Sequence, residues 1–377
     1  MSENSSPSIR FKNLPLDKAA EMIRSAGEPE FRTRQVVKWV YQKRVDSFGA
    51  MTNVSKTTRR KLAGIFTIEK LILAAVVPSP CGDAVKFGFE LRDTSRIIES
   101  VLLIDGDRHT ACLSSQLGCG LGCSFCETGH LGLIRNLTQE EIIGQLIGID
   151  DYCAERGDRL VTNIVFMGMG EALSNFDAFR ASLAIIMDDD CFAIGGRRIT
   201  VSTAGVIPSI ERFMEENLNI GLAISLNDFS NERRSAVMPI NKKFPIETLT
   251  AIAVRYFEKT GRRVTFEYIV IPGETDTEEA AQGLRRLLGS LTCKINLIPL
   301  NPTRGAVVPP SQAEMVRFAK ALRHLGLSAT IRTSRGSDIG GACGQLTAHE
   351  YPRVVAATAM PAQGNTLRPA VLTLTNK

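Results

Sequence analysis

The chain has 377 residues, of which 44% are hydrophobic and 23% are charged, so it can bury a large core and is expected to form more than one domain. No apolar run approaches the roughly twenty residues that a membrane span needs, so we expect no membrane partner.

Positive charge is concentrated at the start of the chain. The first 70 residues hold fourteen Lys or Arg and seven Asp or Glu, whereas the other 307 residues sum to about −2, by difference from the whole-chain charge of +5. A basic first unit on a near-neutral body suggests a polyanionic partner such as RNA. A solvated helical surface is the alternative explanation of the same pattern.

Residues 1–95 are predicted to form a separate, mainly helical unit. Helical periodicity occurs in three segments, residues 16–25, 34–43 and 53–62, and Ser55 is the expected cap of the third. Two strand-like segments follow, residues 71–77 and 85–91.

From about residue 97 onward, strands alternate with helices. The expected strands are residues 111–114, 163–166, 199–202, 221–225, 264–271, 295–298 and 329–332. The expected helices between them include residues 138–149, 246–259, 277–288 and 311–325. This alternation predicts an α/β fold, a partial (β/α)6 barrel over residues 96–346 with its reactive groups at the C-terminal ends of the strands. Residues 347–377 are expected to be a flexible extension.

Cys119, Cys123 and Cys126 are spaced four and then three positions apart in one short segment. This spacing lets a single loop bring three thiolates to one inorganic centre, and thiolates are the usual ligands of iron–sulfur clusters. A four-iron cluster normally takes four cysteines, but the next cysteine is Cys153, so three ligands would leave one iron open. An open iron can bind and reduce a small molecule, as in enzymes that cleave S-adenosylmethionine into a radical.

Two other interpretations of these cysteines are weaker. A structural zinc site needs four ligands, and His130 is the nearby candidate for the fourth. Structural disulfides do not suit an odd number of cysteines, nine, in a chain whose first residues are polar. We therefore expect reduced thiols and a cytoplasmic protein.

A second motif, Met-Gly-Met-Gly-Glu at residues 167–171, follows an expected strand. Glycines let the backbone approach a ligand closely, and Glu171 could meet the ammonium of S-adenosylmethionine; a plain strand-to-helix turn is the alternative. Five further residues fall at expected strand ends, where they could hold the cofactor or be ordinary turn residues: Ser202, Ser225, Leu226, Asn227 and Asn301.

Two more cysteines are candidates for chemistry. Cys112 lies seven residues before the cluster motif, and Cys343 lies among three glycines that could carry it to the barrel mouth. Arg332 and Arg335 could lower the pKa of the Cys343 thiol or contact phosphate. A buried, unreactive cysteine is the alternative.

Together these motifs resemble those of the radical S-adenosylmethionine RNA adenine methyltransferases of the bacterial RlmN family. The matching segments are residues 31–39, 112–119, 135–138, 167–173, 197–205, 238–243, 295–302 and 338–346. So many motifs in order make coincidence negligible.

The resemblance implies one [4Fe–4S] cluster held by Cys119, Cys123 and Cys126, and two molecules of S-adenosylmethionine for each turnover. The implied cofactor-binding residues are Gly170, Glu171, Ser202, Ser225, Leu226, Asn227 and Asn301.

The resemblance also implies the catalytic steps. One S-adenosylmethionine methylates Cys343, and the radical formed from a second removes hydrogen from that methyl group, which then adds to adenine. Cys112 resolves the adduct through a transient disulfide with Cys343. Glu99 occupies the position of the proton acceptor, although an exposed acid on a strand is the simpler interpretation of that residue.

The implied substrates are 23S ribosomal RNA, at an adenine of the peptidyl-transferase region, and transfer RNA, at the adenine 3′ to the anticodon. The target base must be extruded from its stack, and a reducing partner such as flavodoxin must reset the disulfide. We expect a monomer whose first unit grips phosphates through eight cations: Arg32, Arg34, Lys38, Lys43, Arg44, Arg59, Arg60 and Lys61.

Two rival functions stay open. The sister Cfr family methylates carbon 8 of the same ribosomal adenine, and this chain has Ala172 where the carbon-2 family usually has proline. Residues 297–301 and 332–339 look more like the carbon-2 family. The rival from another class is a non-catalytic RNA-binding factor that keeps an iron–sulfur cluster as a structural brace.

Overall fold

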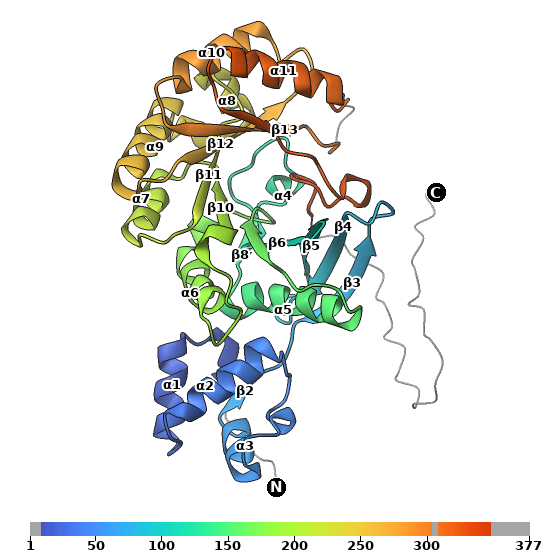
Figure 1. Ribbon diagram of the computed structural model, residues 1–377, viewed down its shortest axis with the longest axis vertical. Coiled ribbons are helices and arrows are strands. Elements are labelled where there is room, and N and C mark those ends of the chain that lie inside the picture. The colour runs from blue at the N-terminus through green and yellow to red at the C-terminus, as the bar shows by residue number, and fades with distance from the viewer. Residues whose placement is uncertain (1–8, 304–307, 348–377) are drawn as a thin grey trace.

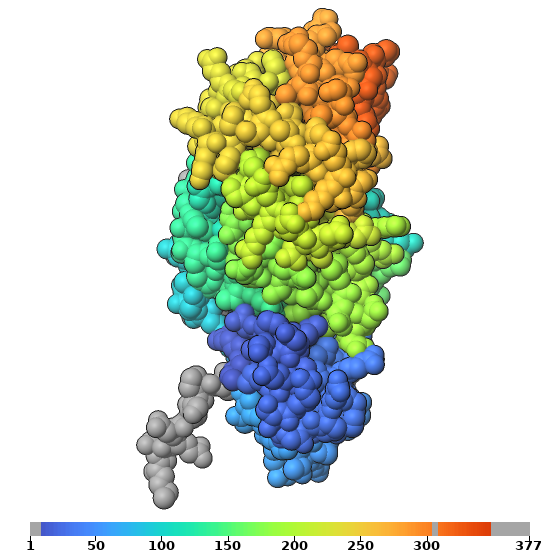
Figure 2. Space-filling view, turned by 90° about the vertical axis from the view of Figure 1, so that its left-hand side faces the viewer, coloured from blue at the N-terminus to red at the C-terminus, as the bar shows by residue number. Residues whose placement is uncertain are grey.

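The computed structural model of the protein describes residues 9–303 and 308–347. Figure 1 shows a small helical unit at one end, a central sheet, and helices on the outside of that sheet. In the space-filling view the first unit forms a lobe at one end of an elongated molecule (Figure 2).

The N-terminal unit contains the three predicted helices. Its elements are β1 (Ile9–Arg10), η1 (Phe11–Asn13), α1 (Leu16–Ser25), α2 (Phe31–Val37), η2 (Lys38–Gln42), η3 (Phe48–Ala50), α3 (Lys56–Ala63) and β2 (Phe66–Thr67). The second helix begins before its expected start at residue 34 and continues as a π-helical turn, η2. The expected cap is confirmed, because the Ser55 Oγ accepts the Thr58 N–H at 3.1 Å.

The main sheet has ten strands within the described residues. Its order is β14 (Ala329–Ile331), β13 (Cys293–Pro299), β12 (Val264–Val270), β11 (Gly221–Ser225), β10 (Ile199–Thr203), β9 (Asn163–Phe166), β6 (Arg108–Cys112), β5 (Ile97–Asp105), β4 (Ala84–Glu90) and β3 (Ile72–Pro78). Strands β6 and β9 to β14 are parallel, whereas β3 to β6 form an antiparallel meander. The outer face of the parallel strands is covered by helices: Phe266 and Tyr268, alternate residues of β12 on this face, are fully buried, and Tyr268 stacks on Phe318.

Helices connect the parallel strands and pack outside them (Figure 1). They are α5 (Gln139–Glu155), α6 (Phe176–Met187), α7 (Ile207–Glu215), α8 (Asn231–Val237), α9 (Ile246–Thr260), α10 (Glu278–Leu288) and α11 (Gln312–His324). Short 3-10 turns accompany them: η4 (Ala172–Asn175), η5 (Gly196–Arg198), η6 (Pro239–Lys242) and η7 (Ser337–Ile339). Six strand-then-helix units followed by a last strand confirm the predicted α/β partial barrel.

A small hairpin interrupts the first unit of the barrel. It pairs β7 (Gln116–Gly118) with β8 (Leu133–Asn136), and α4 (Glu127–His130) lies between these strands in the sequence. The next helix, α5, begins with a capping box formed by Thr138 and Glu141.

The expected boundary at residue 95 falls inside the main sheet. Strands β3 and β4 lie before that position, yet β4 pairs with β5 along its whole length. The first unit is therefore a helical part that ends near residue 68, joined to strands that extend the barrel sheet. Of the expected extension at 347–377, only Thr347 lies within the described residues.

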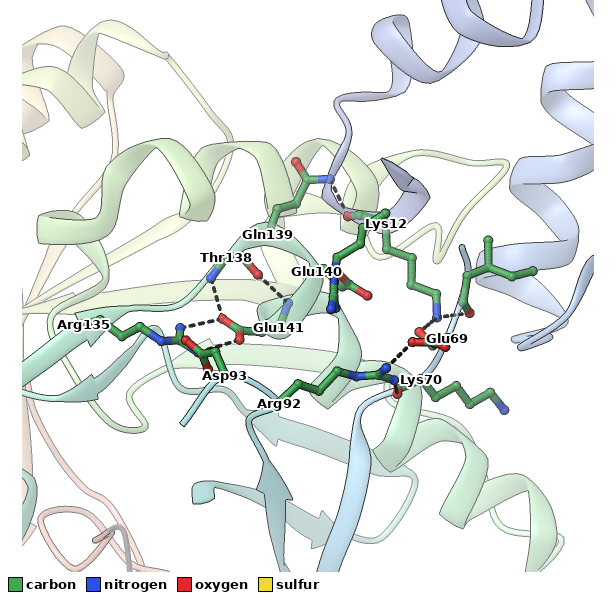
Figure 3. A network of polar contacts seen from close by, with 12 residues as sticks. Lys12, Glu69, Lys70, Arg92, Asp93, Arg135, Thr138, Gln139, Glu140 and Glu141 are labelled. Carbon is green, nitrogen blue, oxygen red and sulfur yellow. Dashed lines mark hydrogen bonds and ion pairs between the residues drawn. The ribbon is translucent and has the colours of Figure 1, made fainter. Parts of the chain in front are cut away.

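The N-terminal unit docks on the start of α5 through a polar network (Figure 3). The Gln139 side chain donates hydrogen bonds to the backbone oxygens of Lys12 (2.8 Å) and Leu14 (2.9 Å). The buried Lys12 Nζ donates to the oxygens of Ile68 (2.8 Å) and Glu69 (2.7 Å).

In the described part of the chain, no helix has the length and apolar character of a membrane span.

Candidate active site

The three cysteines of the cluster motif lie on the loop between β7 and α4. The Cys119 N–H donates to Gly132 O (2.9 Å), and the Cys126 N–H donates to Cys123 O (3.1 Å). The loop must start with glycine, because Gly118 has a φ of +76° and a Cβ there would lie 1.9 Å from Gly132 O. The backbone thus folds this short segment into one compact loop.

Cys119, Cys123 and Cys126 line one cavity of about 170 Å³. Burial raises the pKa of Cys119 to about 11 and that of Cys123 to about 12, so these thiols bind as thiolates only when a cationic centre offsets their burial. Among the described residues, no three candidate ligands gather as a single metal ion would require. In a four-iron cluster each ligating cysteine binds a different iron, so three separated thiols fit such a cluster, with one iron left open, better than they fit zinc.

The same cavity extends over the C-terminal ends of the parallel strands. It is lined by six of the seven residues expected to bind the cofactor: Gly170, Glu171, Ser202, Ser225, Asn227 and Asn301. Leu226 is outside its described lining, because its side chain is fully buried and its N–H donates to Glu267 O (2.9 Å). The structure therefore gathers most of the expected set, and Leu226 contributes to the core.

Glu171 has an unsatisfied oxygen on the wall of this cavity. Its Oε2 accepts the Ala204 N–H at 2.9 Å, whereas its buried Oε1 has no hydrogen-bond partner in the described residues. Burial raises the pKa of Glu171 to about 7. A buried carboxylate oxygen of this kind suits a cationic ligand, and the ammonium of S-adenosylmethionine would satisfy it.

Glu267 is a cavity residue that sequence reasoning missed. It lies on β12, where its Oε2 accepts the Ser202 hydroxyl (2.7 Å) and its Oε1 accepts an N–H of Arg332 (3.3 Å). The sequence could have indicated this residue, because Glu267 is the one acidic residue in a largely apolar strand and an acid is rarely buried without a partner. Ser202 and Arg332 are thereby fixed in place from opposite sides.

Arg234, also missed, holds the strand ends together. Its side chain is fully buried and donates to the backbone oxygens of Ala204 (2.8 Å), Ser225 (2.9 Å) and Leu226 (2.9 Å). Burial lowers the pKa of Arg234 to about 10, and the nearby Cys123 opposes that shift. Nothing local in the sequence distinguishes this arginine from the exposed arginines of the chain.

The Cys343 segment reaches the cavity because three hydrogen bonds tie it down. The Asn301 side chain donates to Cys343 O (3.0 Å). The start of α4 supplies the other two, from the Glu127 N–H to Gly344 O (2.8 Å) and from the Thr128 hydroxyl to Leu346 O (2.6 Å). Cys343 and the cluster motif therefore share one cavity, as the glycine-rich sequence predicted.

Cys112 lies at the C-terminal end of β6, in a second cavity that Cys343 also lines. Burial raises the pKa of Cys112 to about 12, Cys343 adds to this shift, and the guanidinium of Arg332 opposes it. The charge of Cys343 in turn raises the pKa of Arg332. The structure thus brings Cys112 and Cys343 together beside one cation.

Glu99 is fully buried and lies outside the described lining of both cavities. Its Oε1 is 3.2 Å from Lys86 Nζ, and its Oε2 accepts the Thr347 N–H at 2.7 Å. The interpretation of Glu99 as an exposed acid on a strand is therefore wrong. Glu99 instead contacts the segment that carries Cys343.

Most of the cations expected to grip RNA have protein partners. Within the described residues, five of the eight form ion pairs: Arg32 and Lys61 with Glu28, Arg34 and Lys38 with Asp190, and Arg44 with Asp151. Asp190 and Asp151 belong to the barrel, so three of these cations help to dock the unit. Lys43 and Arg60 are exposed.

Comparison with known proteins gives consistent results. The family described as "Ribosomal RNA large subunit methyltransferase N-terminal domain" matches residues 10–68, and the "Radical SAM superfamily" matches residues 113–283. The "Probable dual-specificity RNA methyltransferase RlmN" of Dictyoglomus turgidum is 43% identical over 337 residues, which is 89% of this chain and 96% of that protein. The protein of the same name from Moorella thermoacetica is 42% identical over 90% of this chain and 97% of its own length.

A solved structure is similar throughout the barrel and the N-terminal unit. The crystal structure of a radical SAM methyltransferase from Sphaerobacter thermophilus has a TM-score of 0.85 and 42% identity. The match covers 90% of this chain and all of that one.

Proposed function

Because this chain belongs to the RlmN family of radical S-adenosylmethionine RNA methyltransferases, we propose that it methylates carbon 2 of adenine in two classes of RNA. The substrates are 23S ribosomal RNA, in the peptidyl-transferase region, and transfer RNA, at the adenine 3′ to the anticodon.

The proposal rests chiefly on the position of Cys343, which lines both the cofactor cavity and the cavity that contains Cys112. Carbon 2 of adenine is electron-poor and does not attack a methyl sulfonium. A sulfur between the two cavities can instead accept a methyl group on one side and deliver its carbon on the other. This arrangement supports a mechanism with a methylated cysteine.

The cofactor cavity supplies binding groups for a cluster and for S-adenosylmethionine. A [4Fe–4S] cluster on Cys119, Cys123 and Cys126 would supply the electron that cleaves the sulfonium reductively. Glu171 holds the ammonium group through its unsatisfied Oε1, and the strand-end residues surround the rest of the molecule. Two molecules are consumed for each turnover, one as the methyl donor and one as the radical source.

Cys343 and Cys112 then act in sequence. Cys343 carries the methyl carbon that bonds to carbon 2 of the base. Cys112 loses its proton and attacks the Cys343 sulfur, so that a disulfide forms and the bond from that sulfur to the new carbon breaks. The electron pair of the broken bond passes to the carbon on the base, which takes up a proton and becomes the methyl group. Arg332 favours the Cys112 thiolate that this attack needs. A reducing partner such as flavodoxin returns two electrons to the disulfide.

Glu99 is the proposed acceptor of the proton that leaves carbon 2. Glu99 is fully buried and lies outside the described lining of both cavities, and its Oε2 accepts the Thr347 N–H at 2.7 Å, so it reaches this proton only when the Cys343 segment shifts. We expect that RNA binding causes this shift.

The first test uses anaerobically reconstituted protein, a 23S RNA fragment, S-adenosylmethionine and a reductant. The digested nucleosides are compared with both methyladenosine standards by mass spectrometry. 2-Methyladenosine is the expected product. 8-Methyladenosine would assign the Cfr-like reaction with the same site residues, and absence of a methylated base despite cofactor cleavage would refute the proposed substrate.

A further inference from the structure

The two cavities share a wall in which Cys343 is the reactive residue. Met167, Ile298 and Cys343 line both of them, whereas Cys112 belongs to the described lining of the second alone. The second cavity is therefore adjacent to the sulfur that carries the methyl group, on the side away from the cluster loop.

The lining of the second cavity has two chemically different parts. Its apolar part consists of Leu103, Met167, Ile298 and Leu346. Its polar part is one continuous segment, residues 332–335, with the sequence Arg-Thr-Ser-Arg. The cavity is small, about 30 Å³, so it does not hold a purine as it stands. Its polar segment suits the anionic phosphate of a nucleotide whose base approaches Cys343.

The two arginines of the segment have different partners. Arg332 donates to Glu267 Oε1 (3.3 Å) and to the sulfur of Met167 (3.2 Å), so it belongs to the wall between the cavities. Arg335 instead forms a partly exposed ion pair with Asp105 (2.7 Å), the last residue of β5. The Asp105 carboxylate thus occupies the position of an anion beside the cavity.

We propose that Arg335, at the edge of the second cavity, binds the phosphate of the extruded nucleotide. This inference rests on the proposed function and assigns its RNA subsite. In RNA-free protein Asp105 stands in for the phosphate, and RNA displaces it from the guanidinium. A planar guanidinium suits both partners, because carboxylate and phosphate each accept two parallel N–H bonds.

Arg108 provides a matched control for Arg335. It pairs with the other oxygen of Asp105 at 2.6 Å but lies outside the described lining of the cavity. The experiment compares Arg335→Ala, Arg335→Lys and Arg108→Ala by two readouts. One is the KM for an RNA stem–loop substrate, and the other is methylation of Cys343 without RNA, measured as the intact protein mass.

We expect Arg335→Ala to raise the KM for RNA by about 10-fold or more, with Arg335→Lys recovering part of the loss. Cys343 methylation should stay at the wild-type level, and Arg108→Ala should change the KM less than about twofold. Equal effects of Arg335→Ala and Arg108→Ala would overturn the assignment. An equal loss of Cys343 methylation in Arg335→Ala would do the same, because it would mean that Arg335 only shapes the Cys343 segment.

A binding measurement separates this inference from the proposed function. A stem–loop with 2-aminopurine at the target position gains fluorescence when the base leaves its stack. Its carbon 2 already carries the amino group, so methylation is measured on a parallel stem–loop with adenine at that position. We expect the fluorescence gain with wild-type protein and a weaker one with Arg335→Ala. If both results are observed but the adenine stem–loop yields no methylated nucleoside, the proposed function fails and the subsite stands. If methylation proceeds and Arg335→Ala behaves as wild type, the subsite fails alone.

Discussion

The cofactor cavity and the contact between the N-terminal unit and the barrel both contain buried or half-buried charges. The two regions differ in whether these charges have partners within the protein. At the contact, opposite charges meet: Arg44 and Lys70 share Asp151, at 2.9 Å and 2.7 Å. In the cavity, Glu171 Oε1 is buried with no partner in the described residues. Satisfied charges orient two parts of a protein, whereas an unsatisfied one on a cavity wall marks a place for a ligand.

The largest expected effect is at the wall between the two cavities. Cys343→Ala removes the atom that carries the methyl group, so 2-methyladenosine formation should fall below detection by mass spectrometry. Cys293→Ala, at the start of β13 and outside the described cavity linings, is the control and should keep near wild-type activity. Retained methylation in Cys343→Ala would refute the mechanism. Under the structural-brace rival, Cys343→Ala would be silent, whereas loss of Cys123 would unfold the barrel.

A smaller effect, on the affinity for S-adenosylmethionine, is expected when the buried carboxylate of Glu171 is replaced by an uncharged group. Glu171→Gln keeps the shape of the side chain but cannot form an ion pair with an ammonium group. We expect S-adenosylmethionine affinity to fall by about 10- to 100-fold, measured by calorimetry on reconstituted protein. The matched control is Asp177→Asn, an exposed acid at the start of α6, which should bind normally.

Asp150, on α5 beside the contact between the N-terminal unit and the barrel, is expected to make folding stability depend on pH without affecting methylation. Burial raises the pKa of Asp150 from its ordinary 3.8 to about 6, so the unfolded chain loses this proton at lower pH than the folded chain. Wild-type stability therefore declines as pH rises between these values. Asp150→Asn does not titrate, and its amide oxygen can still accept the Val161 N–H that Asp150 accepts at 2.8 Å.

Above pH 6 we expect Asp150→Asn to be more stable than wild type by about 1 to 3 kcal/mol. Urea unfolding at several pH values between 4 and 8 would measure the difference. A difference that does not grow with pH would show that Asp150 is ionised throughout.

The smallest effect concerns RNA affinity of the N-terminal unit. Neutralising Arg59, Arg60 and Lys61 should weaken RNA binding and flatten its salt dependence. Lys61 is already paired with Glu28, and Arg59 donates to Gly49 O (2.5 Å), so the exposed Arg60 should dominate. We expect the slope of log affinity against log salt to change by about 1, not by about 3. An unchanged slope would exclude this surface as an RNA contact.

These regions also differ in how far their sequences predict them. The cysteine spacing, the glycine-rich turn ending in Glu171 and the alternation of strands with helices are local patterns. The alternation predicted the fold correctly, and the two motifs lie on the lining of one cavity. The basic composition of the first 70 residues predicted an RNA grip, yet Arg34, Lys38 and Arg44 pair with acids of the barrel. Composition counts charges, but it does not show which of them already have partners.

The sequence by itself determined the family, the strand and helix order, and the cysteines and most of the expected cofactor-binding residues that line the cofactor cavity. Periodicity, caps and short motifs act within a few residues, so a linear chain displays them directly. The tertiary structure alone decided that Cys343 lines two cavities, that Glu267 joins Ser202 to Arg332, and that Glu99 is buried beneath Thr347. These contacts join strands and loops far apart in the sequence, and they follow from sheet order and burial.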